Sequence, residues 1–86
     1  MLKYDLAGTV FGLETVWPLT HTLLKEYRTE APAELEVTTT AADISAEREL
    51  ANGERFPDAY LESLAVQRKL SHALLDRDVL LFHGSA

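Results

Sequence analysis

The stretch PDAYLESLAVQRKLSHALL, residues 57–75, decides the fold. It predicts a long helix, because proline is tolerated in a first helical turn and apolar side chains follow at helical spacing. Its charged side chains fall mainly on one narrow stripe, formed by Asp58, Glu62, Lys69 and, just beyond the stretch, Asp76. A helix that is apolar around most of its circumference is buried on more than one side. We therefore expect residues 57–75 to form the core element, in a chain that has barely enough material to cover it.

Shorter elements are predicted ahead of this helix. Alternating apolar and polar residues indicate strands, and apolar residues at helical spacing between capping and stop signals indicate helices. The expected elements are a strand at 2–6, a turn at 7–8, a strand at 10–13, a helix at 16–28, a strand at 35–39 and a helix at 40–51. Thr15 is the expected cap of the first of these helices. Thr40 and Asp43 form a capping pattern for the second, and Asn52-Gly53 provides its left-handed stop.

The run Val79–Phe82 predicts a last strand. It is continuously apolar, as strands buried on both faces of a sheet usually are. The predicted fold class is therefore α+β, a small mixed sheet with three helices in the order β-β-α-β-α-α-β, within a single domain over residues 1–86. Because a domain rarely ends just after its most buried strand, we expect further polypeptide to follow in the natural protein.

Composition argues against several classes of function. The net charge is −6, and between Glu26 and Glu62 there are ten acidic and three basic residues, so neither nucleic acid nor an anionic membrane is an expected partner. The absence of cysteine excludes disulfides, thiolate metal sites and cysteine nucleophiles. Lys3 and Asp5 interrupt the N-terminus before any apolar run begins, so no signal peptide is recognised and a cytoplasmic location is expected.

Few residues suggest chemistry. His72 is expected to be solvated and His21 to lie at the surface, whereas His83 follows the predicted buried strand, where α/β enzymes place ligand-binding groups. His83 is thus either a functional group or a histidine that merely ends a strand. Arg68 lies among apolar neighbours and should reach a carboxylate or lay its stem on apolar surface. The four glycines are too scattered to form a phosphate-binding loop.

Two segments resemble a known family. Residues 56–69, FPDAYLESLAVQRK, and residues 80–86, LLFHGSA, resemble the N-terminal part of bacterial phosphoenolpyruvate carboxykinase-like and HPr kinase-like proteins, and YDLAG at 4–8 is similar to that family's first strand. In this superfamily a strand ends in His-Gly or His-x-Ser-Ala, and a hairpin and a phosphate-binding loop follow. The resemblance implies that His83 contacts a catalytic metal in a longer parent protein that uses ATP with Mg²⁺ or Mn²⁺.

Two functions remain open at this point. On the resemblance, the chain is the N-terminal, non-catalytic segment of a larger P-loop kinase-like phosphotransferase, inert and without a cofactor by itself, because the loop, its lysine and the acidic metal ligands would lie beyond Ala86. Its partner would then be the downstream catalytic core, or a second copy of the chain. Alternatively, the chain is a standalone interaction module that binds a partner through helix 57–75 or through the edge of strand 79–82.

Overall fold

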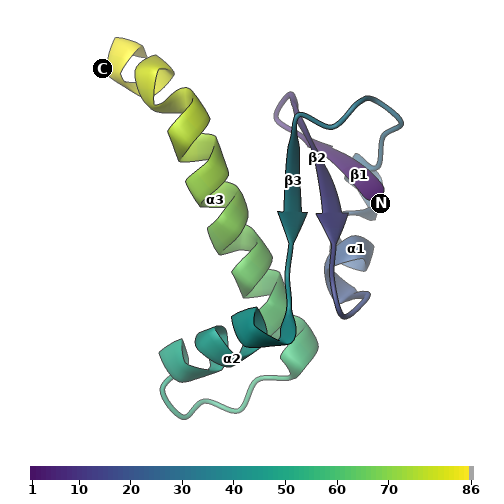
Figure 1. Ribbon diagram of the computed structural model, residues 1–86, viewed down its shortest axis with the longest axis vertical. Coiled ribbons are helices and arrows are strands. Elements are labelled where there is room, and N and C mark those ends of the chain that lie inside the picture. The colour runs from purple at the N-terminus through teal and green to yellow at the C-terminus, as the bar shows by residue number, and fades with distance from the viewer. Residues whose placement is uncertain (86) are drawn as a thin grey trace.

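A three-stranded sheet and three α-helices make up the fold (Figure 1). The computed structural model describes the backbone of residues 1–85 and the side chains of residues 1–75. The elements are β1 (Leu2–Leu6), β2 (Thr9–Glu14), α1 (Leu19–Leu23), the 3-10 turn η1 (Lys25–Tyr27), β3 (Leu35–Thr38), α2 (Ala41–Leu50) and α3 (Asp58–Ser85). The predicted α+β class, with a small mixed sheet and three α-helices, is confirmed.

The sheet has the order β1-β2-β3 and contains both kinds of pairing. β1 and β2 form an antiparallel hairpin, and β2 and β3 are parallel. The hairpin turn is made by Ala7 and Gly8, whose φ angles are 53° and 88°. Positive φ at both central residues matches the right-handed twist of the flanking strands, which is why this two-residue loop suits a hairpin.

The core lies between the sheet and α3. Each strand sends alternate side chains to this face, where they meet the apolar side of α3. The buried cluster consists of Tyr4, Phe11, Leu13, Val37, Val66 and Leu70. α3 also buries Leu61 completely. Residues 57–75 therefore supply the core helix, as their apolar pattern predicted.

The segment around α2 also follows the prediction. The Thr40 hydroxyl accepts from the Asp43 N–H, and the Asp43 carboxylate accepts from the Thr40 N–H, so the capping box is complete. After the helix, Asn52 and Gly53 have φ angles of 52° and 93° and turn the chain toward α3. These local signals are readable in sequence because both partners lie within four residues of each other.

The predicted helix at 16–28 is largely absent. α1 has only five residues and is followed by η1, and the residue that precedes it is Pro18, not Thr15. Thr15 uses its hydroxyl to donate to the Trp17 carbonyl instead of capping the helix. Trp17 precedes Pro18, and the residue before a proline avoids helical backbone angles, so the helix begins only after Pro18.

The predicted strand at 79–82 is wrong, because α3 continues through it to Ser85. The observed order of strands and α-helices is therefore β-β-α-β-α-α, and no strand follows α2 within residues 1–85. No proline or glycine interrupts the chain between Asp58 and Phe82, and leucine, alanine and arginine favour a helix. A short apolar run cannot be distinguished from a buried helical segment by its periodicity. The strand edge proposed at 79–82 as a binding surface does not exist in this structure.

None of the helices in the described part of the chain has the length and hydropathy of a membrane span.

Candidate functional site

The three histidines lie in different structural surroundings. His83 is part of α3, so the strand end that suggested a ligand role is not formed there, and its side chain lies outside the described residues. His72 is exposed on α3, as predicted. His21 is half-buried, with its Nδ1 2.7 Å from the hydroxyl oxygen of Tyr4, so this surface histidine also has a partner that the sequence did not indicate.

The Tyr4–His21 pair is a structural contact. Burial lowers the pKa of His21; the Glu62 carboxylate opposes this shift and Arg28 adds to it. Burial likewise raises the pKa of Tyr4, against the effect of Arg28. Both groups are therefore held neutral near pH 7, with their polar atoms paired to each other. No sequence spacing signals this pair, because its members come from β1 and α1.

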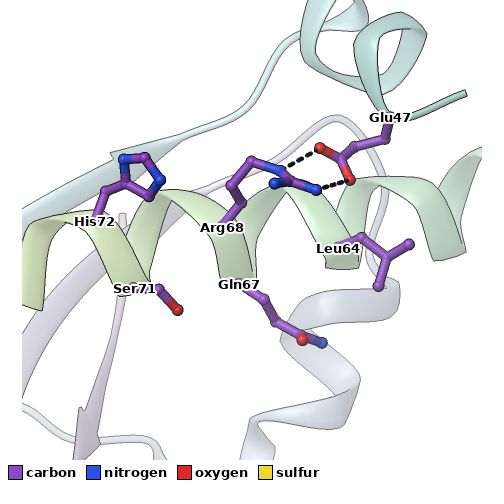
Figure 2. A pocket seen from close by; sticks show the side chains of 6 residues that line it. All are labelled: Glu47, Leu64, Gln67, Arg68, Ser71 and His72. Atoms are coloured by element: carbon purple, nitrogen blue, oxygen red, sulfur yellow. Dashed lines mark hydrogen bonds and ion pairs between the residues drawn. The ribbon is translucent and has the colours of Figure 1, made fainter. Parts of the chain in front are cut away.

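Arg68 reaches a carboxylate, as the sequence predicted (Figure 2). Its Nε and one terminal nitrogen donate to the two oxygens of Glu47, at 2.7 and 3.2 Å. These residues line a shallow cavity of about 340 Å³ along α2 and α3, together with Leu64, Gln67, Ser71 and His72. The two charges neutralise each other across the helix contact, so this ion pair joins α2 to α3 and leaves little charge for a ligand.

The most unusual group is Glu62, whose residue is 0% exposed. One carboxylate oxygen, Oε2, accepts from the Val16 N–H at 2.7 Å and from the Thr39 hydroxyl at 2.8 Å; the other, Oε1, accepts from the Trp17 N–H at 2.8 Å. A carboxylate is tolerated in a protein interior when several such donors replace its water. Glu62 thereby ties α3 to the end of β3 and to the loop that follows β2.

This anchor presents two apolar side chains on the surface. Val16 is 55% exposed and Trp17 is 42% exposed, although both backbone amides are fixed to the buried carboxylate. Tryptophan is highly buried on average and is enriched among the residues that dominate binding energy at interfaces. Loops that carry function are typically held in this way by a rigid scaffold.

A groove lies beside these side chains. Val16 and Trp17 form one wall, α2 forms the other, and the space between them is about 270 Å³. The α2 wall consists of Ala41, Ile44, Ser45 and Arg48, which are spaced at helical intervals on one face, and Asp58 completes the lining. Arg48 forms an ion pair with Asp58 and also donates to the carbonyl of Phe56. We refer to these seven lining residues as the Trp17 groove.

The described side chains form no cluster that could hold a metal ion. Among residues 1–75, no three histidine, aspartate or glutamate side chains gather closely enough to hold a metal ion. The two buried carboxylates, Glu47 and Glu62, are each occupied by donors from the protein itself. The Trp17 groove is instead a cavity lined by an aromatic ring and one ion pair, and this lining suits binding to a protein or peptide.

We compared the chain with protein-family models, with curated proteins and with solved structures, and none of these matches it.

Proposed function

We propose that this chain is a non-catalytic protein-binding unit and that the Trp17 groove is its binding surface. One observation carries the proposal: the buried carboxylate of Glu62 holds the backbone of Val16 and Trp17 while both side chains remain exposed. A loop fixed before binding loses less conformational entropy when a partner arrives. Tryptophan and arginine, which both line the groove, are the residues that most often dominate binding energy at interfaces.

This proposal moves the interaction surface from the positions suggested by the sequence. Helix 57–75 is used mainly to build the core, and among its residues only Asp58 lines the groove. The binding side chains come from the loop after β2 and from α2. The protein would act where it is synthesised, in the cytoplasm, with no need for a cofactor of its own.

A second proposal concerns a larger context and rests on the resemblance of residues 56–69 and 80–86 to carboxykinase-like and HPr kinase-like proteins. In a longer protein of that kind, this unit would be the N-terminal accessory segment of an ATP-dependent phosphotransferase, and His83 would contact its metal. The partner of the unit would then be the catalytic core. In such a longer protein, His83→Ala should lower phosphoryl transfer and leave the unfolding midpoint unchanged. ATP binding by the 86-residue chain alone would contradict this proposal.

The protein-binding proposal is tested by selecting peptides from a random displayed library on the immobilised chain. Each selected peptide is then tested against Trp17→Ser and against Leu50→Ser, a matched control because Leu50 is also exposed and apolar but does not line the groove. We expect a set of peptides that bind wild type and Leu50→Ser but not Trp17→Ser. If no peptide depends on Trp17, the groove is not a protein-binding surface.

A further inference from the structure

The turn that joins α2 to α3 (Figure 1) contains a reactive dipeptide that the proposed binding surface does not use. Asn52 is the only asparagine in the chain, and Gly53 follows it directly. Both residues are exposed, and their φ angles of 52° and 93° lie in the left-handed region. In such a pair the backbone nitrogen of the glycine can attack the side-chain amide of the asparagine, because glycine has no Cβ to obstruct the approach.

The hydrogen bonds that the described residues form in this turn involve neither of the two reacting groups. The Asn52 N–H donates to the Glu49 carbonyl oxygen at 3.2 Å. The Glu54 N–H donates to the Ala51 carbonyl oxygen, also at 3.2 Å. Between them, neither the Gly53 N–H nor the Asn52 side-chain amide has a hydrogen-bond partner among the residues that the structure describes. No atom outside residues 52–54 lies within 4 Å of the place that a Cβ of residue 53 would take, so the approach to the Gly53 nitrogen is also open.

We propose that Asn52-Gly53 is a site of spontaneous deamidation in the folded protein. The Gly53 nitrogen gives its proton to water and attacks Asn52 Cγ; the bond from Cγ to the side-chain nitrogen breaks, and that nitrogen takes up a proton and leaves as ammonia. The succinimide ring that results joins Asn52 Cγ to the Gly53 nitrogen. Water opens this ring at Cγ to give an aspartate with the normal backbone, or at the main-chain carbonyl to give an isoaspartate, whose backbone runs through Cβ and Cγ. One water is consumed and one ammonia is released, so the reaction needs no oxidant and no cofactor.

Both products change the end of α2. Each adds a negative charge directly after the C-terminus of this helix, where the helix dipole disfavours an anion, in a chain whose net charge is already −6. The isoaspartate also lengthens the backbone by one carbon within the turn. Arg48 spans this turn, because it pairs with Asp58 and donates to the Phe56 carbonyl oxygen. The isoaspartate form should therefore be less stable than the unmodified protein. This inference does not depend on the peptide-binding function, which Trp17→Ser tests separately.

The experiment incubates folded wild type in mildly alkaline buffer, beside a sample that is unfolded in guanidinium chloride. Mass spectrometry of the proteolytic peptide around residue 52 measures the products, and an enzymatic assay measures the ammonia released. Asn52→Asp identifies the product with the normal backbone. Asn52→Gly is the matched control, because glycine keeps the positive φ and has no side-chain amide. We expect folded wild type to release ammonia and to give two products, an isoaspartate peptide and one that coelutes with the Asn52→Asp peptide, whereas Asn52→Gly should release none.

Three results would contradict this inference. If the unfolded sample reacts and folded wild type gives no product, the proposal is overturned, because the fold then protects the amide. Equal ammonia release from Asn52→Gly and wild type would also overturn it, because the source would then be Gln67, the only glutamine in the chain. An isoaspartate form that unfolds at the same urea concentration as wild type would refute the expected effect on the end of α2.

Discussion

Replacing Glu62 by glutamine tests the contact on which the groove depends. The side chains have nearly the same shape, but glutamine has one acceptor oxygen and one donor group in place of two acceptors. If the amide oxygen takes the place of Oε2, it can still accept from Val16 and Thr39. The amide nitrogen must then face the Trp17 N–H, so two donors oppose each other at a fully buried position.

The size of the effect follows from these contacts. A hydrogen bond to a charged group contributes about 1.5–3 kcal/mol, and a buried donor left without a partner costs about 1–3 kcal/mol. Because the loop can open and return its amides to water, the losses do not add fully. We therefore expect Glu62→Gln to lower the unfolding free energy by about 2–3 kcal/mol, and Glu62→Ala, which removes all three bonds, to lower it by about 3–5 kcal/mol.

Denaturant unfolding provides the assay, with circular dichroism reporting on the helices and Trp17 emission on the loop. Glu49→Gln makes the same chemical change at an exposed site and should alter the unfolding free energy by less than about 0.5 kcal/mol. Thr39→Val removes only one donor and should cost about 1 kcal/mol. The reasoning fails if Glu62→Gln and Glu49→Gln have the same stability.

Three further predictions concern the fold. Leu61→Ala should lower the unfolding free energy, measured in urea, by about 2–5 kcal/mol. Gln67→Ala, on the exposed side of α3, should change it by less than about 0.5 kcal/mol. Equal losses would mean that the faces of α3 are misassigned. Thr40→Ala removes the α2 cap and should cost about 1 kcal/mol, seen as a lower thermal midpoint; an unchanged midpoint would count against the capping box. Burial places the pKa of His21 below its ordinary 6.5, so the unfolded chain binds the proton more readily than the folded chain. The contribution of His21 to stability should therefore be full above pH 6.5 and should decline as the pH falls through the folded pKa. An identical decline in His21→Gln would refute this.

The parts of the fold that sequence could predict are those whose causes are local. The alternation in β1, the capping box at Thr40 and Asp43, and the left-handed turn at Asn52-Gly53 each depend on residues within a few positions of one another. The core role of residues 57–75 also followed, since it depends on an apolar pattern within a single helix. The sequence even indicated that Arg68 needs a carboxylate, although it could not identify Glu47 as the partner.

The parts it missed have different causes. Glu62 was placed on the polar stripe of its helix, because a glutamate among charged neighbours is typical of a solvated face. Two of its three partners, Val16 and Trp17, lie 46 and 45 positions away in the chain and donate only backbone N–H groups, and the third, the Thr39 hydroxyl, lies 23 positions away. For the shortened helix α1 the cause is local: Trp17 precedes Pro18, and the residue before a proline avoids helical backbone angles. For Val79–Phe82 the cause is different: length and context, not periodicity, decide between helix and strand.

The groove and the core turn out to depend on the same helix. α3 contributes only Asp58 to the lining of the groove, yet both walls are attached to it. The loop wall is tied through Glu62, and the α2 wall is tied through Arg68 and Lys69, which pair with Glu47 and Asp43. The distance between the walls is therefore set by side chains that no partner would touch. It follows that Glu62→Gln should weaken peptide binding as well as stability, whereas a core substitution such as Leu61→Ala should reduce stability and leave the affinity of the folded fraction nearly unchanged.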